Sequence, residues 1–273
     1  MITKQHYFNC LIEYLEPNLK VVLAPDYSGC SIISILEIIK KRKIKLNLIG
    51  APTLGFQADI LIGAGFVNSI ECAAINIGEY GPGPRFKDAF FRKEIKVIDS
   101  TCPAIHSGLQ ASEKGIPFMP IRGIIGSELI KKNKNWIIQE NPFTNKEDPI
   151  VLVKAIKPDI AIFHAPLADK YGNVWIGKRR ELMTMAHASQ KTFVTFERMH
   201  DGNLLDDNEL SSGTIPSIYV SNSTNVPLGS WPVGLYGVHN SDNLELKKYL
   251  SCSKTEDGFM KYIENVKHKS LTN

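Results

Sequence analysis

The sequence has 273 residues, with 32 Lys and Arg against 28 Asp and Glu, so its formal net charge is only +4 at pH 7. This near balance does not indicate a surface built to follow the phosphates of a nucleic acid. A content of 43% hydrophobic and 22% charged residues excludes a mainly disordered chain. The length is sufficient for one large α/β domain, and we expect residues 1–273 to form a single domain.

The first expected elements form a βαβ unit. The apolar run Val21–Ala24 predicts a buried strand that ends at the turn 25–29, where Ser28 is placed to cap a following helix. Apolar residues then recur at helical spacing from Ile32, and a lysine run ends this helix before a second apolar strand over 44–49. Such a unit crosses over right-handed and requires a parallel sheet.

The same alternation continues along the chain. Further strands are expected at 59–62, 95–98, 116–121, 150–153, 160–164, 193–196 and 218–220, with helices over 104–113 and 179–189. Continuous apolar strands of this kind predict an α/β fold with an open, mostly parallel sheet and helices on both faces. The polar stretch 133–148 is interpreted as a surface excursion, and 241–273 as a C-terminal helical extension, one amphipathic helix, with a mobile tail.

Neither a metal site nor a membrane segment is expected. The five cysteines have no C-x-x-C spacing, and the histidines show no H-x-x-x-H pair, which argues against a zinc site or a disulfide scaffold. Charged residues interrupt the first nineteen positions, and no apolar run reaches the roughly 20 residues that span a bilayer. We therefore expect a cytoplasmic protein without membrane or nucleic-acid partners.

The turn after the first strand is the first candidate site. Asp26, Ser28 and Gly29 follow the carboxyl end of that strand, where open α/β sheets bring backbone amides and a helix N-terminus to a ligand. Binding of an anion or a carbonyl oxygen is one interpretation. The other is an ordinary helix cap with a turn glycine.

A second glycine turn, Gly63-Ala64-Gly65, follows the strand expected over 59–62. It has half of the spacing of a dinucleotide-binding fingerprint, but the third glycine and the following acidic residue are missing, which argues against NAD. Close approach of the backbone to another ligand remains open, because glycine has no side chain to block it.

The loop that begins with Glu79, Tyr80 and Gly81 is a further candidate, since irregular loops on rigid scaffolds often carry function. Glu71 and Glu79 could form an acid and base pair, although their spacing does not fix the distance between them.

Thr101 and Cys102 follow the strand at 95–98, again at a carboxyl end. Cys102 is either a nucleophile activated at a helix N-terminus or a small buried apolar residue before Pro103. His164 ends the strand at 160–164 and is either part of the site lining or a satisfied core histidine.

Three blocks of the sequence resemble one family. They are QADILIGAGFVNSIECAAINIGEYGPGPRFKD from Gln57, STCPAIHSGLQASEKGIPFMPIRGIIGS from Ser100 and DIAIFHAPLADKYGNVWIG from Asp159. In this order they are similar to the alpha, or A-type, subunits of glutaconate-type family I coenzyme A (CoA) transferases. The resemblance covers about Val21 to Val220.

The resemblance implies a Rossmann-like, CoA-transferase/NagB-like fold, shared with a beta subunit in a heterodimer or heterotetramer whose active site lies at the interface. In this family a beta-subunit glutamate in an S-E-N-G context attacks an acyl-CoA, and the resulting glutamyl-CoA thioester passes CoA to a carboxylic acid. This chain has no S-E-N-G, so the resemblance assigns it no catalytic residue. The resemblance also implies no cofactor, because the CoA thioester is a substrate. The substrate contacts that we expect are Asp26, Ser28, Gly29, Gly63, Ala64, Gly65, Glu79, Tyr80, Gly81, Thr101, Cys102 and His164.

The first turn departs from the family pattern. Related alpha subunits carry a glycine-rich loop where this chain has 25–29, so Ser28 or Asp26 would make polar contacts instead. Ring-opening CoA-thioester hydrolases are a related branch and carry an acidic residue in the block that matches 100–110, where this chain has Cys102. The alternatives are a subunit of such a hydrolase and a non-catalytic acyl-CoA-binding protein.

Overall fold

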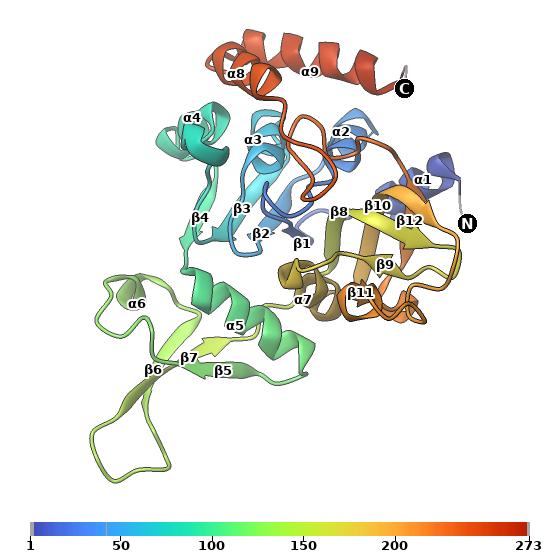
Figure 1. Ribbon diagram of the computed structural model, residues 1–273. Helices are drawn as coiled ribbons and strands as arrows, with labels where there is room; N and C mark the ends of the chain where they lie inside the picture. The colour runs from blue at the N-terminus through green and yellow to red at the C-terminus, as the bar shows by residue number, and fades with distance from the viewer. Residues whose placement is uncertain (1–2, 42, 272–273) are drawn as a thin grey trace.

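The computed structural model describes residues 3–41 and 43–271, and its largest feature is a nine-stranded sheet (Figure 1). In spatial order its parallel strands are β12 (Asn222–Asn225), β10 (Lys191–His200), β8 (Ile160–Asp169), β1 (Lys20–Leu23), β2 (Leu46–Gly50), β3 (Val67–Cys72) and β4 (Lys96–Asp99). Two short strands, β9 (Val174–Trp175) and β11 (Thr214–Ile215), extend it in antiparallel fashion beside the end of β8. The predicted βαβ unit is confirmed, since β1 and β2 pair in parallel across α2 (Ile32–Lys41).

Alternate residues of the central strands point to two separate cores. Val21 and Leu23 of β1 join a core with α1 (Lys4–Tyr14), α2, α3 (Phe56–Gly63) and α4 (Pro84–Phe91). Val22 and Ala24 join a core with α5 (Cys102–Glu113) and α7 (Arg180–Ala188) on the other face. Both faces of the sheet are therefore covered, as the near-continuous apolar strands predict.

The prediction of a strand at 59–62 is wrong, because these residues belong to the helix α3. Nearly every residue of α3 is buried, so the segment is apolar on all sides and lacks the polar face that marks an amphipathic helix. A short apolar run of this kind does not distinguish a buried helix from a strand. The strand of this unit is β3, which the sequence analysis did not predict.

A second sheet of three antiparallel strands stands apart from the large one (Figure 1). It contains β5 (Phe118–Ile121), β6 (Trp136–Glu140) and β7 (Pro149–Lys154), and it packs on α5 and α6 (Leu129–Lys132) through Val151 and Val153. Two of its strands match the expected runs 116–121 and 150–153. The stretch 133–148 contains β6 and the loop that projects toward the lower left of Figure 1.

The strand expected at 218–220 is also wrong. Ser217–Tyr219 form a short 3-10 helix, as do Ser211–Gly213 and Gly78–Tyr80, and β12 begins only at Asn222. The strand signal of Ile218 and Tyr219 is misleading because these side chains are exposed.

The C-terminal region holds α8 (Asn243–Cys252) and α9 (Glu256–Leu271), two helices where the sequence analysis expected one. They lie over α2 and α3 (Figure 1), with Tyr249 of α8 packed on Phe56 of α3 at 4.7 Å between ring centroids. Part of the predicted mobile tail, residues 272 and 273, falls outside the described residues. Within the described ranges, none of the helices combines the length and apolar character needed to cross a bilayer.

Candidate functional site

The candidate site lies where three parallel strands end at the same edge of the large sheet. β1 leads into the turn 25–29, β2 into 51–55, and β4 into Thr101 and Cys102. Because the strands are parallel, their carboxyl ends share one edge, which is where ligands bind in open α/β sheets. The helices α3 and α5 also begin at this edge, and the N-terminus of a helix favours negative charge.

Asp26 faces the N-terminus of α3. Its carboxylate accepts the Phe56 amide at 2.9 and 3.1 Å. Gly55 is required beside it, since a Cβ at that position would lie 2.2 Å from the carboxylate. Burial raises the pKa of Asp26 to about 6, although the Phe56 amide lowers it and the nearby Asp59 adds a smaller upward contribution. Asp26 therefore caps a helix rather than pointing freely into solvent.

Tyr27 and Ser28 connect this turn to α7. Tyr27 is 53% exposed, and its pKa is raised by burial of its inner part and by the charge of Glu181. Ser28 is buried, and its hydroxyl donates to the Glu181 carboxylate. The sequence analysis expected Ser28 to cap α2, and this prediction is wrong. Ser28 instead contacts a carboxylate from a segment 153 residues later.

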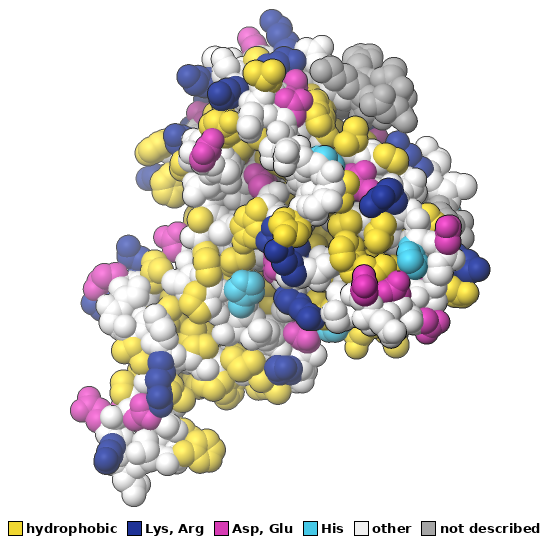
Figure 2. Space-filling view, in the orientation of Figure 1, with side chains coloured by type: hydrophobic (Ala, Val, Ile, Leu, Met, Phe, Trp, Pro, Cys, Tyr) yellow, Lys and Arg dark blue, Asp and Glu magenta, His cyan; other side chains and the backbone are white. Residues whose placement is uncertain are grey.

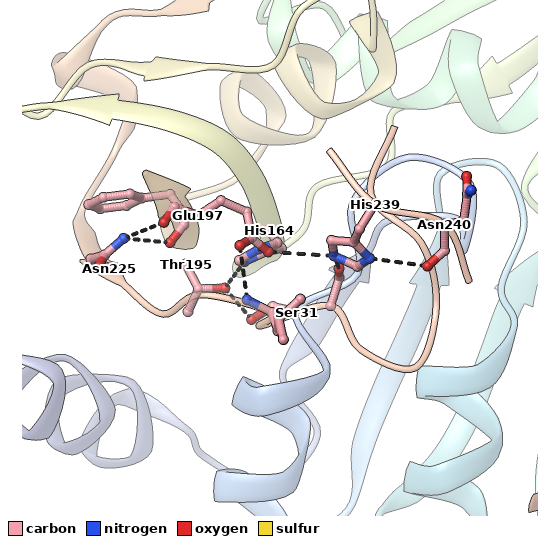
Figure 3. A network of polar contacts seen from close by, with 10 residues as sticks. Ser31, His164, Thr195, Glu197, Asn225, His239 and Asn240 are labelled. Carbon is pink, nitrogen blue, oxygen red and sulfur yellow. Dashed lines mark hydrogen bonds and ion pairs between the residues drawn. The ribbon is translucent and has the colours of Figure 1, made fainter. Parts of the chain in front are cut away.

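Behind the turn lies a buried polar network (Figure 3). His164 contacts Thr195 Oγ1 at 2.7 Å through Nδ1 and Glu197 Oε1 at 2.8 Å through Nε2. Thr195 in turn contacts Ser31 at 2.7 Å, and His239 lies 3.6 Å from Glu197. Residues from β8, β10, the start of α2 and the loop after β12 therefore meet at one point.

The protonation states of His164 and Glu197 fix the direction of these hydrogen bonds. Burial lowers the pKa of His164, although Glu197 opposes this, so the ring is neutral near pH 7. Burial would raise the pKa of Glu197, but hydrogen bonds from His164 and the Leu228 amide outweigh it and lower the pKa. An ionised carboxylate only accepts, so His164 donates from Nε2 and its Nδ1 accepts from Thr195.

The network joins two segments that lie far apart in the sequence. The His164 amide donates to the Gly29 carbonyl at 2.8 Å, and the Leu228 amide donates to Glu197 at 2.9 Å. A Cβ on Gly29 would lie 2.2 Å from the His164 carbonyl oxygen, and one on Gly229 would lie 2.8 Å from the imidazole ring. The network therefore holds the turn 25–29 and the loop 226–241 against β8.

Two cavities border the turn 25–29, one through Asp26 and Tyr27 and the other through Ser28. One of about 340 Å³ is bordered by turns that follow β1, β2 and β3 and by the loop after β12; its lining includes Asp26, Tyr27, Thr53, Leu54, Ala74, Asn76, Ile77, Gly78, Val233 and Ser241. The other, of about 210 Å³, lies at the start of α7 and is lined by Ser28, Pro166, Trp175, Ile176, Gly177, Lys178, Arg179 and Tyr236. The first cavity is near the lower limit of the roughly 300–1,000 Å³ typical of drug-sized sites, and the second is below it.

Gly63, Ala64 and Gly65 lie away from this region, which corrects their assignment to the site. They follow the helix α3 and precede β3, so they occupy the amino edge of the sheet. A Cβ on Gly63 would meet Phe259 and Arg85 at 2.7 Å, so this turn is filled by protein packing. The error follows directly from reading α3 as a strand, because the end of a helix and the end of a strand lie at opposite edges.

The other predicted residues are distributed around the carboxyl edge. Glu79 is exposed, and Tyr80 donates to Asn243 of α8 at 3.3 Å, so the loop with Gly81 faces the C-terminal helices while its neighbours reach the cavity. Thr101 caps α5 by accepting the Ala104 amide at 3.3 Å. Cys102 is exposed rather than buried.

His164 does not end its strand, because β8 continues to Asp169, and the side chain is fully buried. It supports the turn from behind and does not line either cavity. The sequence analysis missed Glu181, Lys178, Arg179 and Tyr236. The first three follow the third family block directly, so their position after that block was the available signal, whereas Tyr236 lies in a loop without one.

No group of three or more His, Cys, Asp or Glu side chains suited to a metal ion occurs in the part of the chain that the structure describes.

The chain is similar in sequence to the A-type subunits of two CoA-transferases. It is 29% identical over 248 residues to that of glutaconate CoA-transferase from Acidaminococcus fermentans, covering 83% of this chain and 75% of that one. It is 28% identical over 237 residues to that of 3-oxoadipate CoA-transferase from Pseudomonas knackmussii, covering 84% and 80%. No protein-family model matches the chain.

Two further relatives are matched over shorter parts of their length. An uncharacterised protein of Archaeoglobus fulgidus is 30% identical over 234 residues, which are 84% of this chain, and the chain spans about half of that relative, 51%. A cholesterol ring-cleaving hydrolase subunit of Rhodococcus jostii is 27% identical over 164 residues, covering 55% of this chain and 52% of that one.

Solved structures show the same fold. Glutaconate coenzyme A-transferase from Acidaminococcus fermentans superposes with a TM-score of 0.85 at 23% identity, covering 97% of this chain and 87% of that one. The decarboxylase AibA/AibB superposes with a TM-score of 0.80 at 22% identity, covering 97% of both. These likenesses confirm the predicted fold class. They do not distinguish reactions, since a transferase and a decarboxylase share the fold.

Proposed function

The chain is a homologue of the A-type subunits of CoA-transferases, and from this premise we propose that it is one half of a two-subunit enzyme that moves CoA from an acyl-CoA to a carboxylic acid. The observation that carries the proposal is the pair of cavities at the carboxyl edge, bordered by the turn 25–29. They lie where this fold binds ligands, and the sequence matches subunits named for CoA transfer over most of its length.

In this proposal the nucleophile comes from the partner chain. A partner glutamate attacks the thioester carbonyl and displaces the CoA thiolate, which then attacks the glutamyl carbonyl to form glutamyl-CoA and release the first acid. The acceptor carboxylate attacks glutamyl-CoA in the same way and leaves as its CoA thioester, with the glutamate restored. Atoms balance without an oxidant, a reductant or a metal ion.

This chain would supply the walls and the polar contacts of the acyl site. The turn 25–29 and the N-terminus of α5 present dipoles that stabilise an oxyanion formed on the thioester carbonyl. Ser28 lines one cavity but donates to Glu181, so it can orient this carboxylate as well as contact substrate. If Ser28→Ala leaves both turnover and KM unchanged, the turn has no part in the acyl site.

The test is to purify the chain with its co-expressed partner and to measure transfer of CoA from acetyl-CoA to carboxylic acids. Borohydride or hydroxylamine added after acyl-CoA should modify one glutamate, and mass spectrometry should locate that glutamate in the partner and not in this chain. The matched control omits acyl-CoA. An adduct on this chain, or transfer without any adduct, would contradict the mechanism.

A CoA-thioester hydrolase is the second candidate function. It is favoured by the similarity to the ring-cleaving hydrolase and by Glu181, a carboxylate beside Ser28 at the site that could activate water. Release of free CoA without an acceptor acid, lost in Glu181→Gln, would support it. A complex that binds acyl-CoA but performs neither reaction would be a non-catalytic binding protein.

A further inference from the structure

A polar cavity of about 220 Å³ lies on the face of the large sheet that packs against α5. A row of four residues crosses this face in register on neighbouring strands, namely Lys20, Asn47, Ser69 and Lys96. Val22, two residues after Lys20, packs in the core with α5, which places the row on that face. The first three residues of the row line the cavity, and no described residue of its lining borders either cavity at the carboxyl edge. The cavity is therefore separate from the candidate acyl site.

Glu71 supplies the carboxylate of this cavity. It lies two residues after Ser69 on β3, so it points to the same face, and it is half-buried. Burial raises the pKa of Glu71, while a hydrogen bond from Asn135 and the charge of Lys20 lower it. The sequence analysis considered Glu71 together with Glu79, but Glu79 does not line this cavity. Glu71 is thus a partly desolvated acid to which the proposed function assigns no role.

Two lysines line the cavity from the two sheets. Lys20 begins β1 of the large sheet, and Lys154 ends β7 of the small one. Both are exposed and therefore accessible to a ligand, and neither forms an ion pair within the residues that the structure describes. Figure 2 shows another face, on which Lys and Arg are interspersed with Asp and Glu, as is usual for a solvated surface. In the cavity, by contrast, two cations and one carboxylate share a small space without pairing.

The other groups of the lining leave nothing polar to satisfy. Ser69 donates to Asn47 Oδ1 at 2.7 Å, and Asn47 donates to the Asn18 carbonyl at 2.6 Å. The apolar residues of the lining are Leu48, Ile49, Ile98, Ala155 and Ile156. A ligand therefore meets one carboxylate and two ammonium groups beside an apolar surface.

These charges favour a zwitterion over a simple anion or cation. A lone carboxylate would pair with the lysines but bring a second negative charge next to Glu71, and a lone amine would leave both lysines unpaired. A molecule with both groups forms charge-assisted hydrogen bonds to each side. The volume of about 220 Å³ equals that of roughly seven water molecules at roughly 30 Å³ each, which admits a small amino acid but not a nucleotide.

We propose that this cavity binds a small α-amino acid, with its ammonium group on Glu71 and its carboxylate on Lys20 and Lys154. The side chain of the ligand lies against Ile49 and Ile98. The inference is independent of the proposed function, because the cavity shares no lining residue with the carboxyl edge.

The test compares L-alanine with propionate, which keeps only the carboxylate, and with ethylamine, which keeps only the ammonium group. Calorimetric titration of the purified chain at neutral pH should show L-alanine binding at least about 10-fold more tightly than either analogue, the gain expected from one further charge-assisted contact. Inorganic phosphate is the fourth probe. Propionate or phosphate binding as tightly as L-alanine would assign the cavity to anions and overturn the inference. Equal binding of ethylamine, or binding of none of the four probes, would overturn it as well.

Substitutions locate the binding. Glu71→Gln should weaken binding of L-alanine about 10- to 100-fold and strengthen that of propionate, because it removes the partner of the ammonium group and the repulsion of the carboxylate. Lys20→Gln and Lys154→Gln should weaken binding of both probes by a smaller factor, since these lysines are exposed. Thermal unfolding without ligand shows that each variant folds. If Glu71→Gln does not fold, the exposed Lys20 still decides, because unchanged binding in Lys20→Gln would contradict the inference.

Lys96→Gln is the matched control. Lys96 lies in the same row of the same face and is exposed, but it does not line the cavity. Its substitution should leave binding of L-alanine unchanged. Equal losses in Lys96→Gln and Lys20→Gln would show a general effect of charge and overturn the inference. Because no CoA is present in these titrations, their outcome is separate from that of the proposed function.

Discussion

The two edges of the large sheet each carry a turn with glycine, and the two turns have different surroundings. At the carboxyl edge, the turn 25–29 is backed by the buried network of His164 and Glu197 and borders two cavities. At the amino edge, the glycine turn 63–65 packs against Arg85 and Phe259. In this sheet the glycine turn that follows a strand borders cavities, whereas the glycine turn that follows a helix is filled by protein packing.

The largest difference between the edges should come from removing the network. His164→Leu removes one buried hydrogen-bond partner from the Thr195 hydroxyl and one from the Glu197 carboxylate, and we expect a loss of about 2–5 kcal/mol in the free energy of unfolding. Asn68→Leu is the control near the amino edge, where an exposed amide contacts Asn18 at 3.2 Å, and it should change that free energy by less than about 0.5 kcal/mol. Urea unfolding measures both, and similar losses would remove the distinction.

A pair of glycine substitutions sharpens the same comparison. Gly29→Ala places a methyl group 2.2 Å from the His164 carbonyl oxygen, so the turn must shift at a cost of about 1–3 kcal/mol or more. Gly65→Ala meets no atom within 4 Å and costs only about 1 kcal/mol, because its φ of 79° disfavours a side chain.

Thermal unfolding together with acyl-CoA binding tests this pair. Only Gly29→Ala should weaken binding, and weaker binding in Gly65→Ala would assign the amino edge a functional role after all.

The smallest predicted effect concerns pH. The pKa of His164 is lowered from 6.5, so the unfolded state takes up its proton first and His164 reduces stability as the pH falls below about 6.5. Asp26 acts in the opposite sense, because its pKa is raised from 3.8 to about 6 and the folded state takes up the proton first.

Asp26→Asn should therefore steepen the loss of stability between pH 7 and 5, whereas His164→Leu should flatten it. Denaturant midpoints at several pH values check both slopes. Identical slopes in the two variants and the unmodified chain would show that neither group titrates in this range.

Most of the strands could be predicted because they are buried on both faces and read as continuous apolar runs, as in β1, β8 and β10. The same property misled at α3, which is buried on all sides, and this one error moved Gly63–Gly65 to the wrong edge. The strand prediction at Ile218 and Tyr219 failed for the opposite reason, since these side chains are apolar but exposed.

Predicted site residues that directly follow a strand do lie at the carboxyl edge, near the cavities. Ser28 lines a cavity, and Cys102 lies close enough to influence Tyr27. The sequence did not predict contacts with residues of a distant segment, such as Glu181 beside Ser28 and Tyr236 beside Arg179. Nothing in the local sequence of either member of these pairs specifies the other.

The sequence by itself determined the open α/β fold, the βαβ unit at its start and the turns that border the candidate site, because these follow from local hydrophobic pattern and short connections. Only the tertiary structure decided that His164 is a buried support, that Ser28 contacts Glu181, and that Arg179 lies between two tyrosines. These contacts join residues far apart in the chain. They depend on how β8, α7 and the loop 226–241 pack together, which no local pattern of residues specifies.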